Sequence, residues 1–305
     1  MKYIFRKPRA VILNDTRRDS NHLGCHLVMK NLQDLCARNG INVIGTIQSK
    51  ERPRNDDFVT TFLERISRAD IVILNGEGSL HHDRGVGLLE QVDLAVQKKK
   101  KAFLVNSVWE ENPRSKQYLG LFKLSAFRET TSLSIAKADG ACGALNVPDL
   151  SLYSCFETSH QRTEKIMFTD SVIPDVSKTL EDTAEELQVP LFPMSEQTDN
   201  MLTVAAISNA AVVVGGRFHA LCLCLSTGTP MLSIESNTHK ISALLSDLGV
   251  ENQKYMFKDA ESVCSSSVLA FKQMDHSEFL SNAFDYTVKA RAKMEQMFSQ
   301  IRSLA

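Results

Sequence analysis

Short apolar runs alternate with segments of helical periodicity along most of the chain. In the first half, the β-branched and aliphatic runs that predict buried strands lie at residues 9–14, 41–47, 70–78 and 101–109. The segments between them repeat apolar residues at helical spacing. The clearest of these is 22–38, and Asn39-Gly40 predicts its end. This alternation predicts an α/β fold with a mostly parallel sheet covered by helices on both faces.

A second series of the same kind begins near residue 160. Strands are expected at 164–172, 189–195, 211–216 and 229–235, and helices at 177–187, 198–210, 217–228 and 238–249. A long amphipathic helix begins at about His276. Because the pattern breaks near 150–162, we predict two doubly wound domains over 1–155 and 156–275, followed by a helix over 276–305. One continuous sheet is the alternative.

Composition narrows the class of protein. The 305 residues include 35 basic and 36 acidic side chains, so the net charge of −1 gives no overall field that would attract nucleic acid or an anionic membrane. No run approaches the ~20 apolar residues of a membrane span, and the apolar run from Ala10 to Leu13 is too short for a signal peptide. Seven scattered cysteines without paired zinc spacing fit reduced thiols. We therefore expect a cytoplasmic protein.

Polar and glycine-rich segments follow several of the predicted strands. In open α/β sheets, ligands bind outside the carboxyl ends of the strands, because the loops that leave those ends surround a crevice. The segments with this chemistry lie at residues 14–24, 75–83, 215–220 and 234–240. We expect them to converge on one cleft.

The segment 215–220, Gly-Gly-Arg-Phe-His-Ala, carries the most information. Gly215 and Gly216 permit close approach of the backbone to a ligand, and the helix that begins there offers N–H groups and a favourable dipole to an anion. Arg217 can bind a carboxylate or phosphate through two nitrogens, and His219 can transfer a proton near neutral pH. The structural alternative is a helix start whose arginine pairs with a carboxylate and whose histidine is a core residue.

The segment 75–83 places Glu77 between two glycines, where its carboxylate would face the cleft. A carboxylate there can bind sugar hydroxyls or act as an acid or base. His81, His82 and Asp83 follow it closely. Adjacent histidines project in different directions and lack the His-x-x-x-His spacing of a helical metal site, so we predict an exposed polar loop and no metal.

Several short segments occur in a definite order along the chain. They are Asn21-x-x-Gly24, Asn75-Gly76-Glu77-Gly78-Ser79, Arg128-Glu129 with Ser132, Pro148-Asp149, Arg217-Phe218-His219-Ala220 and Gly228-Thr229-Pro230. In this order the chain resembles the polysaccharide pyruvyl transferase family over about residues 10 to 245. The Arg-Phe-His-Ala segment with the Gly-x-Pro start of the next strand is the strongest of the matches. The loop 14–24 departs from the family pattern and adds Arg17, Arg18 and His22 as cationic candidates.

The resemblance implies two Rossmann-like, doubly wound domains that face a cleft (GT-B-like), with the C-terminal helix returning to the N-terminal domain. It implies transfer of a pyruvyl group from phosphoenolpyruvate to a pair of sugar hydroxyls of a cell-surface polysaccharide or its precursor, which forms a ketal. The N-terminal domain would hold the acceptor, a sugar or lipid-linked glycan, and the C-terminal domain the donor. No cofactor, metal or nucleic-acid partner is expected, and an oligomer is compatible with this assignment.

The resemblance also implies roles for individual residues. Arg217 would clamp an anion of the donor, His219 would protonate the methylene carbon or the departing phosphate, and Glu77 would orient or deprotonate the acceptor. Substrate contacts are expected from Asn21, Gly24, Gly76, Gly78, Ser79, Arg128, Gly215, Gly216, Glu235 and Lys240. Lys240 is a candidate to balance Glu235. Arg128 has a second reading as a structural ion pair with Glu129 or Asp149.

Two other functions stay open from the sequence. A GT-B glycosyltransferase would use a nucleotide sugar, with the second domain holding the diphosphate. A non-catalytic glycan-binding protein on the same fold would bind neither donor. Stabilisation of the fold by phosphoenolpyruvate or by a nucleotide sugar discriminates between these functions.

Overall fold

The computed structural model describes residues 6–17, 22–48, 56–156, 162–194 and 200–305. The chain divides into two compact units. Unit 1 consists of Met1–Asp19, Val28–Leu150 and Ala292–Ala305, and unit 2 of Ser20–Leu27 and Ser151–Arg291. Two helices contribute residues to both units, namely α1 (Leu23–Arg38) and α11 (Ser277–Leu304). The domain bounds 1–155, 156–275 and 276–305 stay a prediction.

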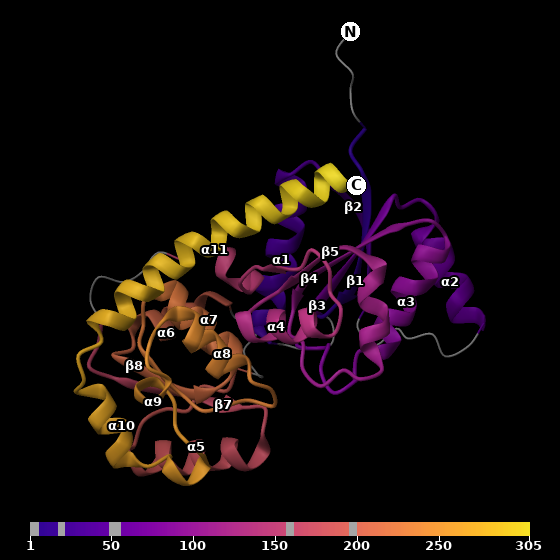
Figure 1. Ribbon diagram of the computed structural model, residues 1–305. Coiled ribbons are helices and arrows are strands. Elements are labelled where there is room, and N and C mark those ends of the chain that lie inside the picture. Colours follow the sequence, from indigo (N-terminus) through magenta and orange to yellow (C-terminus); the bar gives the residue numbers. More distant parts are fainter. Residues whose placement is uncertain (1–5, 18–21, 49–55, 157–161, 195–199) are drawn as a thin grey trace. The chain divides into compact units, whose positions relative to one another are not determined.

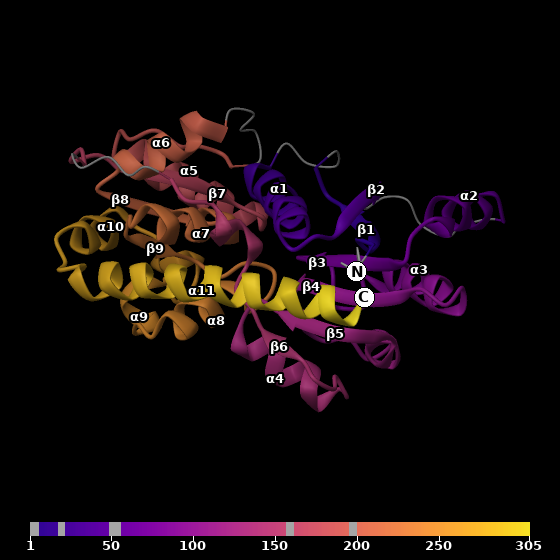
Figure 2. The same cartoon turned by 90° about the horizontal axis from the view of Figure 1, so that it is seen from above.

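Unit 1 is built on a parallel sheet. Among the described residues its six strands are β1 (Arg9–Asp15), β2 (Asn42–Gln48), β3 (Ile71–Glu77), β4 (Lys101–Ser107), β5 (Phe122–Phe127) and β6 (Leu145–Asn146). Their order is β2-β1-β3-β4-β5-β6, which can be followed in Figure 2. The chain adds strands on one side of β1 and then on the other, so the sheet has a topological switch point between β1 and β3.

Helices cover the sheet of unit 1. They are α2 (Asp56–Ser67), α3 (Val86–Gln97), the 3₁₀ helix η1 (Ser115–Leu121), α4 (Thr130–Ala138) and the part of α1 from Val28. Alternate strand residues such as Val11, Val72 and Leu104 join one core cluster with α2 and α3. The intervening residues, such as Ile12 and Ile73, are also buried. Burial on both faces explains why these strands are continuous apolar runs in the sequence.

Unit 2 contains a smaller parallel sheet. Its described strands β7 (Ile166–Ser171), β8 (Val212–Gly216) and β9 (Met231–Ser233) lie in the order β7-β8-β9. The helices are α5 (Pro174–Glu186), α6 (Asn200–Asn209), α7 (Phe218–Thr227), α8 (Lys240–Leu248), α9 (Asn252–Tyr255) and α10 (Ser265–Lys272), with the 3₁₀ turns η2 (Leu150–Tyr153) and η3 (Ala260–Ser262). Figure 1 shows α6 and α7 on one side of the strands and α5 and α10 on the other.

Helix α7 is apolar on every side because it is enclosed. Nine of its residues are buried, including Cys222 and Cys224. It contacts α6, α8 and the strands β8 and β9. A helix that is hydrophobic all round is buried in the protein interior. Because α7 is packed on every side, its first turn is held in place at the carboxyl end of β8.

Most predicted elements are confirmed within two to three residues, and one is wrong. Of the expected strand at 189–195, the described residues up to Met194 form only an isolated bridge between Leu191 and Phe168. Pro190 and Pro193 lack the N–H groups that a ladder requires, so the apolar character of this segment reflects packing without strand pairing. The short helices α9 and α10 were not predicted. No helix among the described residues is long and apolar enough to cross a membrane.

Candidate functional site

The polar segments of unit 1 meet at the switch point between β1 and β3. Asn14 at the end of β1 donates from Nδ2 to the carbonyl of Asn75 at 2.6 Å and to Ser79 Oγ at 3.2 Å. Thr16 Oγ1 donates to Glu77 Oε2 at 2.7 Å, and Asn75 Nδ2 donates to the same oxygen at 3.2 Å. The carboxylate of Glu77 is therefore held in a fixed orientation, and the side chain is only 5% exposed.

Three residues at adjacent strand ends have left-handed backbone conformations. They are Asn14 (φ 67°), Glu77 (φ 41°) and Asn106 (φ 59°), at the ends of β1, β3 and β4. Such conformations cost free energy in non-glycine residues and gather where surrounding contacts hold a functional arrangement in place. Asn14 Oδ1 is buried without a hydrogen-bond partner among the described residues. This group is the candidate polar site of unit 1.

The glycines beside Glu77 differ in what surrounds them. A β-carbon on Gly76 would lie 2.5 Å from Ser107 Cβ, so this glycine permits close packing of β3 against β4. A β-carbon on Gly78 would meet nothing within 4 Å. Packing thus explains Gly76 without a ligand, whereas Gly78 lies beside open space.

Arg128 is explained by a buried ion pair. Its Nη1 donates to Asp149 Oδ2 at 3.0 Å, and both side chains are at most 2% exposed. Glu129 lies 4.0 Å from Arg128 Nε and accepts a short hydrogen bond from Ser132. These contacts favour the structural reading of Arg128 over the predicted substrate contact. A buried guanidinium needs such a partner, because an unpaired charge there would be strongly destabilising.

The loop after Gly78 is polar, but its groups are engaged. His81 Nδ1 and His82 Nδ1 lie 2.8 Å apart, and His82 Nε2 lies 3.0 Å from Glu111 Oε2. The carboxylate of Asp83 accepts N–H groups of Arg114 and Ser115, at the start of η1. His81 is buried rather than exposed as predicted. Among the residues that the structure describes, no group of three or more His, Cys, Asp or Glu side chains is placed to hold a metal ion.

Arg217 lies at the carboxyl end of β8, where it pairs with Asp170 at the end of β7. Its Nε donates to Asp170 Oδ2 at 3.0 Å, and Nη2 donates to the same oxygen. The other oxygen, Oδ1, accepts the N–H of Met194 at 2.8 Å. Arg217 is the N-cap of α7, and no described side chain caps that helix start. The pair matches the structural alternative for the arginine, and it also fixes the guanidinium at the strand ends.

His219, in the first turn of α7, lies against the start of α1. Its ring centroid is 5.2 Å from that of His22, and the two rings are inclined by 61°. A β-carbon on Gly24 would lie 2.5 Å from His219 Cβ and closer still to the ring. Gly24 therefore makes room for His219, a packing role that differs from the predicted substrate contact. His22, Gly24 and His219 all belong to unit 2.

His22 is surrounded by cationic groups. Burial, together with the charges of His219, Arg217 and Lys240, holds the pKa of His22 well below its usual range. The predicted residues Arg217, His219 and Lys240 therefore each lie close enough to His22 to act on its charge. Arg17, the other described cationic candidate of the loop 14–24, instead forms an ion pair with Asp15 in unit 1 at 2.6 Å.

The remaining residues predicted for this site have structural roles. A β-carbon on Gly215 would collide with Thr169, and one on Gly216 would lie 2.7 Å from Ser171 Oγ, so both glycines permit packing of β8 against β7. Glu235 caps α8: Oε1 accepts the N–H of Ile241 at 3.2 Å and Oε2 that of Ser242 at 3.1 Å. Lys240 Nζ donates to Asn237 Oδ1 at 2.6 Å, and its predicted balance of Glu235 stays a prediction.

The predicted site residues thus form one group in each unit. Glu77 and Ser79 share a network in unit 1, and Arg217, His219, Lys240 and Gly24 gather in unit 2. Their convergence on one cleft stays a prediction, and Asn21 lies outside the described residues. Asp170 was not among the predicted site residues, and His22 was predicted only as a cationic candidate. Asp170 ends a predicted strand, so the strand-end rule identifies it, whereas the partner of His22 lies far away in the chain.

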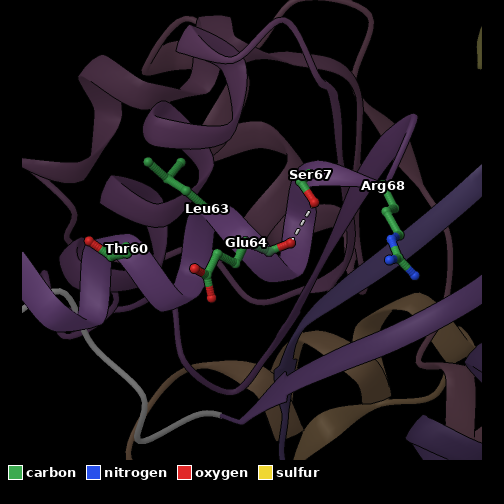
Figure 3. A pocket seen from close by; sticks show the side chains of 5 residues that line it. All are labelled: Thr60, Leu63, Glu64, Ser67 and Arg68. Atoms are coloured by element: carbon green, nitrogen blue, oxygen red, sulfur yellow. Dashed lines mark hydrogen bonds between the residues drawn. The ribbon is translucent and has the colours of Figure 1, made fainter.

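Two cavities among the described residues lie away from these polar groups. One, of about 710 Å³, lies along α2 and is lined by Thr60, Leu63, Glu64, Ser67 and Arg68 (Figure 3). Ser67 Oγ there donates to the carbonyl of Glu64 at 2.6 Å, a contact within the helix. Another, of about 780 Å³, lies between α9 and α10. Neither is lined by a predicted site residue, so the polar clusters and not these hollows are the candidate site.

Known proteins resemble the chain in fold and, over a short span, in sequence. An uncharacterised protein from Klebsiella pneumoniae is 13% identical, with a TM-score of 0.50 over 83% of this chain and 94% of that one. MurG of Acinetobacter baumannii is 12% identical, with a TM-score of 0.52 over 98% and 100%. TcCGT1, crystallised with UDP, is 10% identical, with a TM-score of 0.57 over 96% and 99%. No curated protein matches the sequence.

These likenesses establish the fold, which is α/β and GT-B-like with two Rossmann-like units. The family model for polysaccharide pyruvyl transferases matches residues 201–238. This span includes nearly all of α6, then β8, the whole of α7 and β9, and therefore the Arg217–His219 segment and Glu235. Over this span, the chain carries the sequence pattern of the polysaccharide pyruvyl transferase family.

Proposed function

We propose that the protein transfers a pyruvyl group from phosphoenolpyruvate to two hydroxyls of a sugar in a polysaccharide or its precursor. One observation carries the proposal: the span that matches the family model holds Arg217 and His219, which lie with Lys240 around His22 at the strand ends of unit 2. The matched span includes the carboxyl end of β8, and α/β proteins bind ligands at the carboxyl ends of their strands. A match confined to core segments would support only the fold.

Unit 2 is suited to the donor. Phosphoenolpyruvate carries a carboxylate and a phosphate, which require cations and free N–H groups. Asp170 holds Arg217 through Nε and Nη2, and Nη1 makes no hydrogen bond to the described residues. The start of α7 offers N–H groups that no described side chain caps. We assign Arg217 to one donor anion, with Asp170 as the residue that positions it.

The proposed reaction balances without a cofactor. His219 gives a proton to the methylene carbon of phosphoenolpyruvate, which leaves a cationic C2 that the first sugar hydroxyl attacks while losing its proton to a base. The bond from C2 to the phosphate oxygen then breaks, the second hydroxyl adds to C2, and the proton of that hydroxyl leaves with the phosphate. His219 and the base regain their starting protonation by exchange with solvent. The products are a cyclic ketal and inorganic phosphate.

Unit 1 is suited to the acceptor side of this reaction. Glu77 is a buried carboxylate whose Oε2 accepts hydrogen bonds from Thr16 and Asn75, which fix its orientation. A carboxylate held in this way can accept a hydroxyl proton or bind a sugar hydroxyl pair. We assign the base of the first attack to Glu77. The unpartnered, buried Oδ1 of Asn14 beside Ser79 is a further acceptor for a sugar hydroxyl.

The donor is tested by the melting temperature of the purified protein. Phosphoenolpyruvate at saturating concentration should raise it, because a ligand that binds only the folded state stabilises it by about 2.7 kcal/mol at one hundred times Kd. A nucleotide sugar should have no effect. Incubation with phosphoenolpyruvate and sugar acceptors should then release phosphate and produce a ketal methyl signal in NMR spectra.

The opposite results point to other functions. Stabilisation by a nucleotide sugar alone would replace the proposal by a glycosyltransferase activity. No response to either donor, with binding of glycans, would indicate a non-catalytic glycan-binding protein. The Arg217→Lys variant is the control, since it should lose the response to phosphoenolpyruvate while keeping the fold.

A further inference from the structure

His22 caps the first turn of helix α1. Its Nδ1 accepts the backbone N–H of Gly24 at 3.1 Å. A nitrogen that accepts a hydrogen bond carries no proton, so in this geometry the ring proton of the neutral imidazole is on Nε2. The cap thus fixes the tautomer, in the way that a second hydrogen bond commonly sets the role of the other ring nitrogen.

The surroundings keep this ring neutral. Protonation would convert Nδ1 into a donor, break the cap and place a positive charge at the positive end of a helix dipole. The titratable and charged groups around the ring are His219, Arg217, Lys240 and His26, which also disfavour a further positive charge. His22 therefore offers a hydrogen-bond donor without a charge, unlike Arg217 and Lys240 beside it.

Among the described residues, the imidazole of His22 makes one hydrogen bond, through Nδ1, and its donor nitrogen Nε2 has no partner there. The acidic groups nearby are engaged, since Asp170 pairs with Arg217 and Glu235 caps α8. The group formed by His22, Arg217, His219 and Lys240 therefore combines hydrogen-bond donors with positive charge.

We propose that His22 is a neutral hydrogen-bond donor whose Nε2–H binds an oxyanion, phosphate or carboxylate, next to Arg217 and His219. This inference rests on the proposed function for the identity of the ligand, phosphoenolpyruvate, but not for its chemical class. A neutral donor orients the anion without adding a charge next to His219. His219 is thereby left as the group that takes up and gives the proton.

Two substitutions separate the two nitrogens of His22. In His22→Asn the side-chain oxygen occupies the place of Nδ1 and preserves the cap, because asparagine is a favoured N-cap residue, but the Nε2 donor is lost. In His22→Gln the amide reaches the place of Nε2 and keeps the donor, at the expense of the cap. We expect His22→Asn to fold normally and to bind inorganic phosphate about tenfold to one hundredfold more weakly than the wild type, as for a lost hydrogen bond to a charged group.

His22→Gln should bind phosphate within about threefold of the wild type and melt at a lower temperature. A spectrum of protein labelled with ¹⁵N-histidine, assigned by comparison with His22→Asn, should show His22 protonated on Nε2 alone, with a signal that moves when phosphate is added. Protonation on Nδ1, an unmoved signal, or no phosphate binding by the wild type would overturn the inference. Wild-type affinity in His22→Asn would overturn it as well.

The readout separates this inference from the proposed function. If phosphate binds through His22 as described but phosphoenolpyruvate and acceptor give no ketal, the inference stands and the pyruvyl transfer is wrong. If ketal forms at the wild-type rate in His22→Asn and phosphate affinity is unchanged, the function stands and the role of His22 is wrong.

Discussion

Replacement of Gly24 by alanine tests whether this glycine exists to make room for His219. The new β-carbon would lie 2.1 Å from His219 Cγ and Nδ1, whereas ordinary contacts begin at 3.4 Å, so the histidine must recede by about 1.3 Å. Overpacking of this kind costs about 1–3 kcal/mol. The higher helix propensity of alanine relative to glycine stabilises α1 by up to about 1 kcal/mol, which offsets part of this cost. The net destabilisation expected is about 1–2 kcal/mol.

The effect on activity should exceed the effect on stability. A misplacement of about 1 Å in a reacting group can lower turnover by about one hundredfold, because the alignment that binding supplies is lost. We therefore expect Gly24→Ala to lower ketal formation by about that factor while the melting temperature falls by about 2–8 °C. Melting is followed by circular dichroism, because Trp109 is the single tryptophan and reports on unit 1.

Gly78→Ala is the matched control. Its β-carbon meets nothing within 4 Å, and a glycine-to-alanine change in a compatible loop leaves stability equal or raises it by about 0.4–1 kcal/mol. A β-carbon there does not touch His219, so the ¹⁵N-histidine spectrum should be unchanged, whereas Gly24→Ala should shift the His219 signals. Wild-type melting, wild-type turnover and an unmoved His219 signal in Gly24→Ala together would refute the packing role.

Four further outcomes follow from the site. Arg217→Lys should lose at least about nine-tenths of the activity in a folded protein, because an ammonium cannot replace the two-nitrogen contact with Asp170; wild-type turnover would remove Arg217 from the site. His219→Gln should bind the donor within a few-fold but turn over ~10²–10⁴ times more slowly, as for a lost general acid; collapse of donor binding with surviving single-turnover chemistry would make it a binding residue. Glu235→Ala should lower the free energy of unfolding by about 0.5–2 kcal/mol through loss of the α8 cap, with donor affinity unchanged; a selective loss of affinity would restore its predicted substrate contact. Activity should survive exhaustive chelation, measured as phosphate release; restoration by one divalent ion after its loss would make the His81–Asp83 loop a metal site.

Much of the fold can be predicted from the local pattern of apolar and polar residues. A strand buried on both faces must be apolar throughout, so residues 9–14 and 70–78 are recognisable without any partner. The segment 189–195 shows the limit of this reasoning. It has the apolar content of a strand, but its prolines lack the N–H groups that a ladder requires. Only the tertiary structure shows that pairing with β7 is limited to the bridge at Leu191.

For the candidate site, too, one part could be predicted from the sequence and another part could not. The sequence by itself identified the strand ends that carry chemistry, since glycines, Arg217, His219 and Glu77 follow apolar runs at positions where an α/β sheet exposes ligands. It did not assign their roles. Gly215, Gly216 and Glu235 were expected to meet a ligand, and each is accounted for by contacts within the protein.

Tertiary structure decided which groups meet. Asp170 and Arg217 are 47 residues apart, and Gly24 and His219 come from opposite parts of the chain, yet each pair is in contact. Local propensity reflects interactions over a few residues, so it fixes helices and strands. A hydrogen bond or a steric contact depends on positions to within an ångström, and those positions follow from the packing of all the elements at once.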